Sequence, residues 1–126
     1  LTYHEQGLDL EVLKAFNIKD AKNPDLSIWK DIVRKIENPL GEVKIAIVGK
    51  YTKLKDSYKS IIEAFAHASI ANEVKVKLIW INSRSFMSEK IVEKLKDVHA
   101  ILVPGGFGSN GIEVKFAAIK YARENK

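Results

Sequence analysis

The first part of the chain has hydrophobic positions spaced as in helices, and no strand pattern occurs before about residue 41. Leu10, Leu13 and Phe16 indicate one short helix. A second helix is predicted to begin at Asn23-Pro24, because a capping side chain followed by proline suits the first turn of a helix. Its apolar positions recur at i, i+3, i+4 and i+7, as on one face of an amphipathic helix: Trp29, Ile32, Val33 and Ile36. Residues 38–41, Asn-Pro-Leu-Gly, then break the helical pattern.

After residue 41 the pattern changes to alternating strands and helices. Residues 45–48, Ile-Ala-Ile-Val, are continuously apolar, which is typical of a parallel strand covered on both faces. Residues 74–81 first alternate and then become apolar, which predicts a strand with one exposed stretch. Between these strands a helix is predicted from about Ser57, with these residues on one face: Tyr58, Ile61, Ile62 and Phe65.

The same alternation continues to the last residues. A short helix that begins at Ser88 is expected to turn three residues inward: Ile91, Val92 and Leu95. Residues 100–103, Ala-Ile-Leu-Val, predict the third strand. A third helix follows, and its inward positions are expected to be Ile112, Phe116 and Ile119.

This element order predicts an α/β fold of three layers, in which a parallel sheet of strand order 2-1-3 has helices on both faces. A helical linker precedes it. The third strand is apolar and carries no charge that would discourage pairing, so the sheet is expected to be incomplete and to need a fourth strand. In such a sheet, ligands bind beyond the carboxyl ends of the strands where the strand order reverses.

Composition narrows the function classes. The chain has 126 residues, a net charge of +5 and no cysteine, which excludes a disulfide framework, a thiolate metal site and a cysteine nucleophile within it. No apolar run approaches the length of a membrane span, and no stripe of arginine and aromatic residues indicates nucleic-acid binding. The three histidines are far apart in sequence, so no metal site is predicted. A cytoplasmic protein is expected, and a piece of a longer one.

Two loops should meet at the carboxyl ends of the first and third strands. Residues 49–56, GKYTKLKD, are rich in lysine, and residues 104–111, PGGFGSNG, contain four of the seven glycines. An anionic or carbonyl-bearing ligand is expected there, although a solvated lysine face and a wide turn are the simpler alternatives. The pattern G-x-G-x-x-G at residues 106–111 is a weak cofactor signal, because it follows the third strand and the acidic residue expected about 20 positions later would fall at the end of the chain. The lysine loop is not a P-loop, since Ile45 stands where that motif needs glycine.

Both loops resemble those of CTP synthase. Residues 43–68, VKIAIVGKYTKLKDSYKSIIEAFAHA, and residues 97–125 resemble the start of its class I glutamine amidotransferase domain, and V-G-K-Y together with V-P-G-G-F-G makes the resemblance specific. Residues 6–16 resemble the end of the synthetase domain. The resemblance implies that residues 1–41 are the end of the synthetase domain and the interdomain linker. It implies that residues 42–126 are the N-terminal half of the amidotransferase domain.

The resemblance also implies a reaction, its ligands and its site residues. CTP synthases form CTP from UTP with ATP, Mg and glutamine. GTP activates ammonia release from glutamine, and the enzymes are homo-oligomeric. The glycine loop of the family lines the glutamine site, and a main-chain N–H in it holds the oxyanion, a role that carries over to Gly105, Gly106, Phe107 and Gly108. The GTP-effector and lid positions carry over to Lys50, Lys59, Asn110, Gly111 and Glu113. Asn110 stands where the family has arginine, and Val114 stands where it has glycine, which puts GTP-triggered lid closure in doubt.

The catalytic residues of the family have no counterpart in this chain. Its nucleophile is a cysteine in G-x-C-x-G, followed much later by a histidine and a glutamate, and none of these motifs occurs here. The first hypothesis is therefore a fragment of CTP synthase that is inactive alone. The alternative is a free-standing α/β domain that binds a nucleotide or another anion without catalysis, and a Rossmann-type oxidoreductase is a distant third.

Overall fold

The computed structural model describes residues 1–84 and 90–125, and it separates into two compact units. These are Leu1–Asn38 and Pro39–Lys126. No helix within the described ranges is long and apolar enough to cross a membrane. Each unit is described below by itself.

The first unit consists of helices without a buried core. Its helices are α1 (Thr2–Glu5), α2 (Leu8–Ala15) and α3 (Ser27–Glu37), and none of them has a buried residue. His4 Nδ1 lies 2.5 Å from Asp9 Oδ2, which joins α1 to α2, and this hydrogen bond lowers the pKa of Asp9. The amphipathic face predicted on α3 is largely open, since Trp29 is 61% and Ile36 57% exposed.

The predicted start of the second helix is wrong. The helix begins at Ser27 rather than at Asn23-Pro24. The Asp25 carboxylate accepts a hydrogen bond from the backbone N–H of Ser27 at 2.9 Å, and this contact also lowers the pKa of Asp25. An aspartate side chain that accepts a hydrogen bond from the backbone N–H two residues ahead stabilises a turn. This turn occupies the residues just before the helix, which begins only at Ser27.

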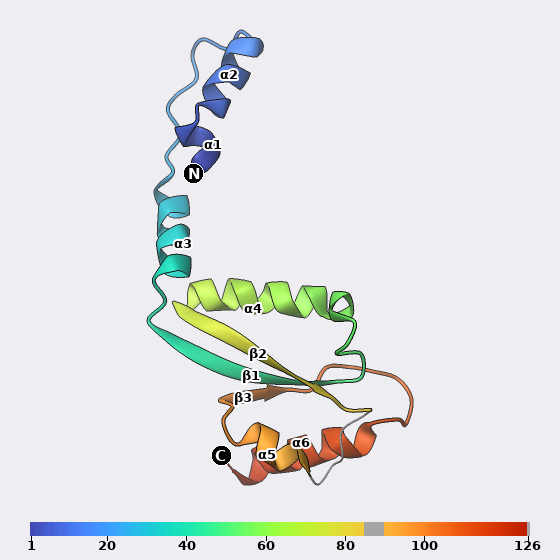
Figure 1. The fold of residues 1–126 in the computed structure, drawn as a ribbon. Coiled ribbons are helices and arrows are strands. Elements are labelled where there is room, and N and C mark those ends of the chain that lie inside the picture. Colours follow the sequence, from blue (N-terminus) through green and yellow to red (C-terminus); the bar gives the residue numbers. More distant parts are fainter. Residues whose placement is uncertain (85–89, 126) are drawn as a thin grey trace. The chain divides into compact units, whose positions relative to one another are not determined.

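The second unit has the predicted three-layer fold (Figure 1). Its elements in chain order are β1 (Gly41–Gly49), η1 (Lys55–Tyr58), α4 (Lys59–Ala71), β2 (Val74–Asn82), α5 (Ile91–Leu95), β3 (Ala100–Leu102) and α6 (Ile112–Glu124). The three strands are parallel in the order β2-β1-β3, so the predicted fold class and strand order are confirmed. Ile47, in the middle strand, pairs with Trp80 on one side and with Leu102 on the other. Helix α4 covers one face of the sheet, and α5 and α6 cover the other.

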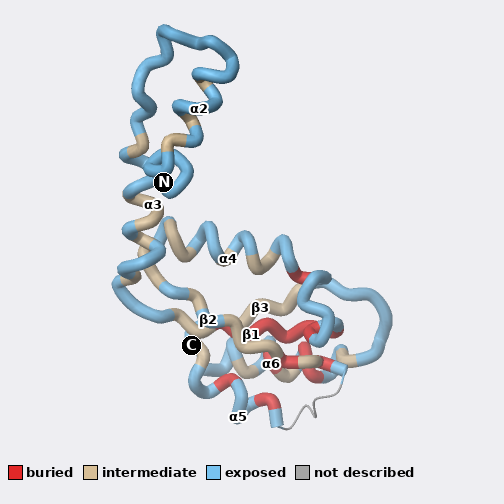
Figure 2. Tube along the Cα trace, turned by 45° about the horizontal axis from the view of Figure 1, so that its top comes forward, coloured by how far each residue is buried: buried red, intermediate tan, exposed pale blue. Residues whose placement is uncertain are grey.

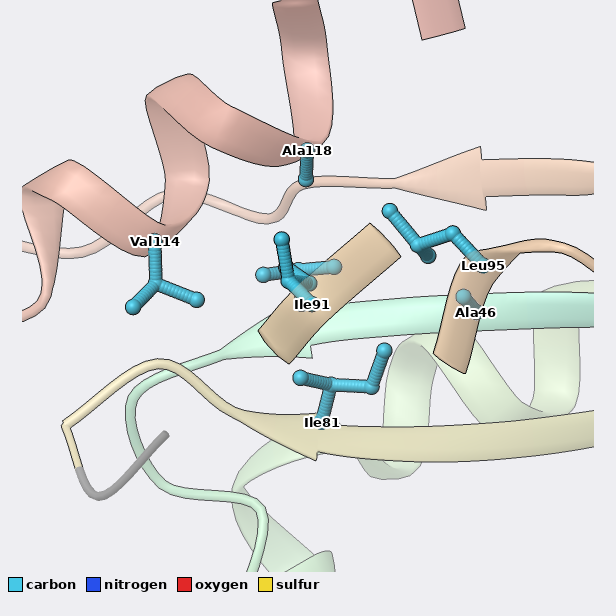
Figure 3. Packing of buried hydrophobic residues seen from close by; sticks show 7 residues of the cluster. Ala46, Ile81, Ile91, Leu95, Val114 and Ala118 are labelled. Atoms are coloured by element: carbon cyan, nitrogen blue, oxygen red, sulfur yellow. The ribbon is translucent and has the colours of Figure 1, made fainter. Parts of the chain in front are cut away.

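The central strand carries the core, as its continuous apolar run predicted. All residues of β1 from Ile45 onward are buried, and Figure 2 shows the other buried positions gathered mainly around it in α5 and α6. Side chains of a strand alternate between its faces, so Ala46 and Val48 join the cluster under α5 and α6 while Ile47 points to the α4 face. The cluster beneath α5 and α6 is shown in Figure 3 and consists of Ala46, Val48, Ile81, Ile91, Leu95, Val114 and Ala118. On the α4 face, the rings of Tyr58 and Trp80 pack in a tilted arrangement, with a centroid distance of 5.4 Å and an interplanar angle of 53°.

Two predictions about inward-facing side chains are wrong. The positions Ile112, Phe116 and Ile119 of α6 are 39%, 63% and 50% exposed, and Val92 of α5 is 39% exposed. The buried residues of α6 are instead Val114, Lys115 and Ala118. The expected start of the preceding helix at Ser88 lies outside the described residues.

A close contact constrains the start of α6. Gly111, which precedes the helix, lies so close to Ser83 that an added Cβ would be 2.6 Å from the Ser83 carbonyl oxygen. This contact fixes the start of the helix beside the end of β2. The small side chain of Ala118 then faces the sheet, and the larger apolar residues lie on the outer side.

The corrected packing predicts an ordering of core substitutions. Ile91→Ala should lower the free energy of unfolding by about 2–5 kcal/mol, because Ile91 is fully buried and its removal leaves a cavity. Ile119→Ala should cost less than about 1 kcal/mol, because half of this side chain is already in water. Urea denaturation followed by circular dichroism measures both.

Ile91→Val is the milder variant if Ile91→Ala does not fold, with an expected loss of about 0.5–1.5 kcal/mol. A larger loss for Ile119→Ala than for Ile91→Ala would show that α6 packs on the face that the sequence pattern indicated.

Candidate functional site

The ammonium group of Lys50 ties the lysine loop to the glycine loop. Lys50 follows β1 directly and is only 5% exposed. Its Nζ donates hydrogen bonds to the carbonyl oxygens of Phe107, at 2.6 Å, and of Gly108. The two loops therefore lie side by side at the carboxyl end of the sheet, as the strand order predicted.

A second buried lysine holds the beginning of the glycine loop. Lys115, in the first turn of α6, is 8% exposed, and its Nζ donates a hydrogen bond to the carbonyl of Pro104 at 2.9 Å. Burial lowers the pKa of Lys115, and the nearby positive charge of Lys50 lowers it further. The sequence analysis missed this residue, because a lysine on an amphipathic helix is normally read as solvated and only the fold shows where its ammonium ends.

The two lysines orient the peptide groups of the loop. The carbonyls of residues 104, 107 and 108 turn toward buried ammonium groups. The peptide bonds are trans, so the N–H of the following residue points the opposite way in each peptide plane. The N–H groups of Gly105, Gly108 and Ser109 consequently face away from the lysines, and none of them donates to an acceptor among residues 1–84 and 90–125. The loop presents outward donors suited to a negatively charged or carbonyl oxygen.

The glycines of the loop serve different purposes. Gly108 and Gly111 have φ angles of +80° and +79°, a region that other residues enter at a cost. Gly106 lies against the lysines, since an added Cβ would be 3.4 Å from Lys115 Nζ. Gly105 has neither constraint: its φ is not positive, and nothing lies within 4 Å of the place of a Cβ. The open space at Gly105 would allow a ligand to approach the main chain.

A cationic hollow opens beside the loop. One pocket of about 230 Å³ is lined by Lys50, Tyr51, Arg84, Phe107, Gly108, Ser109 and Asn110. An adjoining pocket of about 310 Å³ is lined by Lys50, Tyr51, Lys53, Leu54, Asn82 and Arg84. No carboxylate belongs to either lining. Arg84 lines both pockets and was not singled out from the sequence, since an isolated arginine after a strand carries no pattern.

The remaining predicted site residues are placed as follows. Asn110 lines the smaller pocket with Lys50. Lys59 is the exposed first residue of α4, Glu113 is exposed in the first turn of α6, and neither lines a pocket described above. The ring of Phe107 is 99% exposed at the pocket's rim. The assignment of these residues to glutamine and to an effector stays a prediction.

Among residues 1–84 and 90–125 no three His, Asp or Glu side chains gather into a group that could hold a metal ion. His99, predicted to be structural, accepts a hydrogen bond at Nδ1 from the backbone N–H of Lys44 at 2.9 Å. Its own N–H donates to the Lys44 carbonyl at 2.8 Å, so His99 ties the start of β3 to β1.

Comparison with known proteins decides the family. The family model for class-I glutamine amidotransferase matches residues 53–126, which is more than half of the chain. The chain belongs to this family. Over all of its 126 residues the chain is 57% identical to the CTP synthase of Maricaulis maris (strain MCS10) and 55% identical to that of Azospirillum brasilense. It spans 23% of the length of each of these relatives.

A solved structure agrees with the assignment. It is the glutaminase domain of the Trypanosoma brucei CTP synthase with bound acivicin, which is 36% identical to this chain and has a TM-score of 0.60. The match covers 66% of this chain and 33% of that chain. The resemblance to CTP synthase is thereby confirmed. The glycine loop and the lysine loop described above are elements of an amidotransferase fold.

Two glycines of the amidotransferase loop provide a matched stability test. Gly108→Ala should cost about 1–2 kcal/mol, because alanine must adopt a positive φ but meets open space, with Lys50 Nζ 4.0 Å away. Gly111→Ala should cost clearly more, because its Cβ also collides with the Ser83 backbone. Urea denaturation gives the two free energies, and equal losses would show that the Ser83 contact does not constrain α6.

The lowered pKa of Lys115 predicts a pH dependence. The folded protein releases the Lys115 proton at a lower pH than the unfolded chain does, so the unfolded state binds more protons between that lowered pKa and 10.5. The cost of burying the charge is therefore present below this window and disappears as the pH rises through it. Relative to Lys115→Met, the wild type should gain stability as the pH approaches 10.5.

Urea denaturation at a series of pH values measures this difference. Lys120→Met, an exposed position of the same helix, is the matched control for the loss of one positive charge. A wild-type disadvantage that grows with pH would contradict the burial of the Lys115 ammonium.

Proposed function

We propose that this chain is the segment of a CTP synthase in which residues 1–41 end the synthetase domain and form the interdomain linker, and residues 42–126 begin the glutamine amidotransferase domain. The whole enzyme would aminate UTP to CTP in an ATP- and magnesium-dependent reaction with glutamine as nitrogen donor. The similarity to curated CTP synthases over the entire chain supports this assignment. We further propose that the protein is cytoplasmic and that the whole enzyme, of which this chain is a segment, is homo-oligomeric, as the family implies.

The glycine loop is proposed to bind glutamine and to stabilise the oxyanion formed when its amide is attacked. The observation that carries this role is the set of outward N–H groups of Gly105, Gly108 and Ser109, whose peptide planes are oriented by Lys50 and Lys115. Donors fixed in advance toward a developing negative charge stabilise it without reorganisation. Gly105 and Gly106 would provide the approach to the main chain, with Phe107 and Gly108 completing the loop.

The nucleophile is not among the residues of this chain, because it has no cysteine. The chain would contribute oxyanion donors to a site whose thiol lies elsewhere in the amidotransferase. The GTP effector is proposed to act on the lid formed by Asn110, Gly111 and Glu113, together with Lys50 and Lys59. Since Asn110 provides no guanidinium, its contact to an anion would be weaker than that of the arginine expected there.

A second candidate function is a domain that binds a nucleotide or another anion without catalysis. The carboxylate-free lining of the two pockets favours this candidate. It predicts anion binding that is independent of glutamine chemistry, so the two functions differ in what the loop glycines do.

A chimeric enzyme tests the proposed function. The corresponding segment of the Maricaulis maris CTP synthase is replaced by these 126 residues, and CTP formation is measured with glutamine and, separately, with ammonia. The chimera should use both nitrogen sources. Gly105→Ala should lower the glutamine-dependent rate by about 100-fold, as expected when an oxyanion donor is obstructed, and leave the ammonia-dependent rate unchanged.

Gly41→Ala is the matched control. Like Gly105, Gly41 has no atom within 4 Å of the place of a Cβ and no positive φ, but it lies at the amino end of β1, away from the loop. If Gly105→Ala and Gly41→Ala behave alike with glutamine, the loop has no role at the reacting amide and the non-catalytic alternative is favoured. The 126-residue chain alone should release no ammonia from glutamine.

A further inference from the structure

We propose that Arg84 is the main ligand-facing cation of a phosphate-binding subsite, formed by the pocket of about 230 Å³ between the end of β2 and the glycine loop. This inference deepens the effector part of the proposed function, on which the identity of the ligand as a guanine nucleotide rests. The subsite itself rests on the pocket and its charges.

The ammonium group of Lys50 would not bind the ligand directly. Its ammonium is buried and already donates to two carbonyls of the loop. A ligand that captured this ammonium would leave those carbonyls without their donor and would release the loop. Lys50 contributes positive potential to the pocket while it holds the loop in place.

Arg84 meets the requirements that Lys50 does not. It is exposed, and no carboxylate in the described part of the chain pairs with it. Its backbone is held by a hydrogen bond of 2.9 Å from its N–H to the side-chain oxygen of Asn82, which fixes where the residue leaves the sheet. A guanidinium presents several donors in one plane and matches two phosphate oxygens at once.

The glycine loop, which lines the same pocket, supplies neutral donors. The N–H groups of Gly108 and Ser109 point away from Lys50 and have no acceptor among the described residues. The Asn110 amide lines the same pocket. Arginine, backbone N–H groups and an amide without any carboxylate form a set of donors suited to a phosphate group.

The adjoining pocket indicates the length of the ligand. It shares Lys50, Tyr51 and Arg84 with the first pocket and adds Lys53. A chain of phosphates that begins at the loop could continue past Arg84 toward Lys53, whereas a single phosphate would fill only the first pocket. The subsite is therefore assigned to a polyphosphate, such as the triphosphate of a nucleotide.

Titration of the 126-residue chain with sodium tripolyphosphate, followed by the ¹⁵N–¹H signals of Gly108, Ser109 and Asn110, tests the inference. The wild type should show saturable shifts at these three amides. Arg84→Gln should weaken binding about tenfold, the loss expected for one charge-assisted pair. Lys75→Gln removes the same charge at an exposed position of β2 that lines neither pocket, and at about 0.15 M salt it should change the affinity less than twofold.

Two further variants sharpen the result. Arg84→Lys keeps the charge but not the planar fork, so it should retain only part of the affinity. Lys53→Gln should weaken tripolyphosphate but not inorganic phosphate, because only the longer anion reaches the adjoining pocket. The dispersion of the amide signals confirms for each variant that the fold is intact.

The outcomes separate this inference from the proposed function. The subsite is refuted if tripolyphosphate leaves the three amides unshifted, or if Arg84→Gln and Lys75→Gln have equal effects. If GTP binds and Arg84→Gln does not weaken it, the effector proposal stands and the Arg84 subsite falls. If tripolyphosphate binds through Arg84 and GTP binds no better, the subsite stands and the effector proposal falls.

Discussion

The buried ammonium of Lys50 is the contact on which the rest of the site depends. A charge removed from water needs polar partners, and here the partners are carbonyls of the glycine loop rather than a carboxylate. The charge and the loop therefore stabilise each other: without the loop the ammonium is buried unpaired, and without the ammonium the loop carbonyls have no donor. Lys115 repeats the arrangement at Pro104, although the repulsion between the two ammonium groups adds a cost.

The two ammonium groups orient the peptide dipoles of the glycine loop. Carbonyls that turn inward toward lysine leave N–H groups that turn outward, and an outward row of donors favours an oxyanion or a phosphate. Glycine is needed in such a loop for more than one reason. Gly108 and Gly111 satisfy the geometry of the main chain, while Gly105 leaves open space. The glycines of this loop therefore serve two purposes: Gly108 and Gly111 allow the backbone conformation, and Gly105 leaves the main chain accessible.

The sheet brings together groups that are remote in the chain. Lys50, Arg84 and the glycine loop follow β1, β2 and β3, so the parallel arrangement places all three at one end of the sheet. The proposed glutamine role and the proposed phosphate subsite are compatible, because Gly105 lies outside the lining of the cationic pocket whereas Gly108 and Ser109 belong to it. The two roles would share Lys50, which orients the loop for both.

The sequence by itself determined the order of strands and helices, the burial of β1 and the meeting of the two loops. These features follow from local patterns: a continuous apolar run needs cover on both faces, and parallel strands align their carboxyl ends. The face of α6 was decided only by tertiary structure, because the cluster formed with α5 and the strands takes in Val114 and Ala118 and leaves the most apolar stripe of the helix exposed. The hydrogen-bond partner of Lys115 and the position of Arg84 in the pocket were also decided only by the tertiary structure. The hydrophobic pattern of a sequence does not indicate where a long cationic side chain places its charged group, which depends on the carbonyls and the open space around it in the fold.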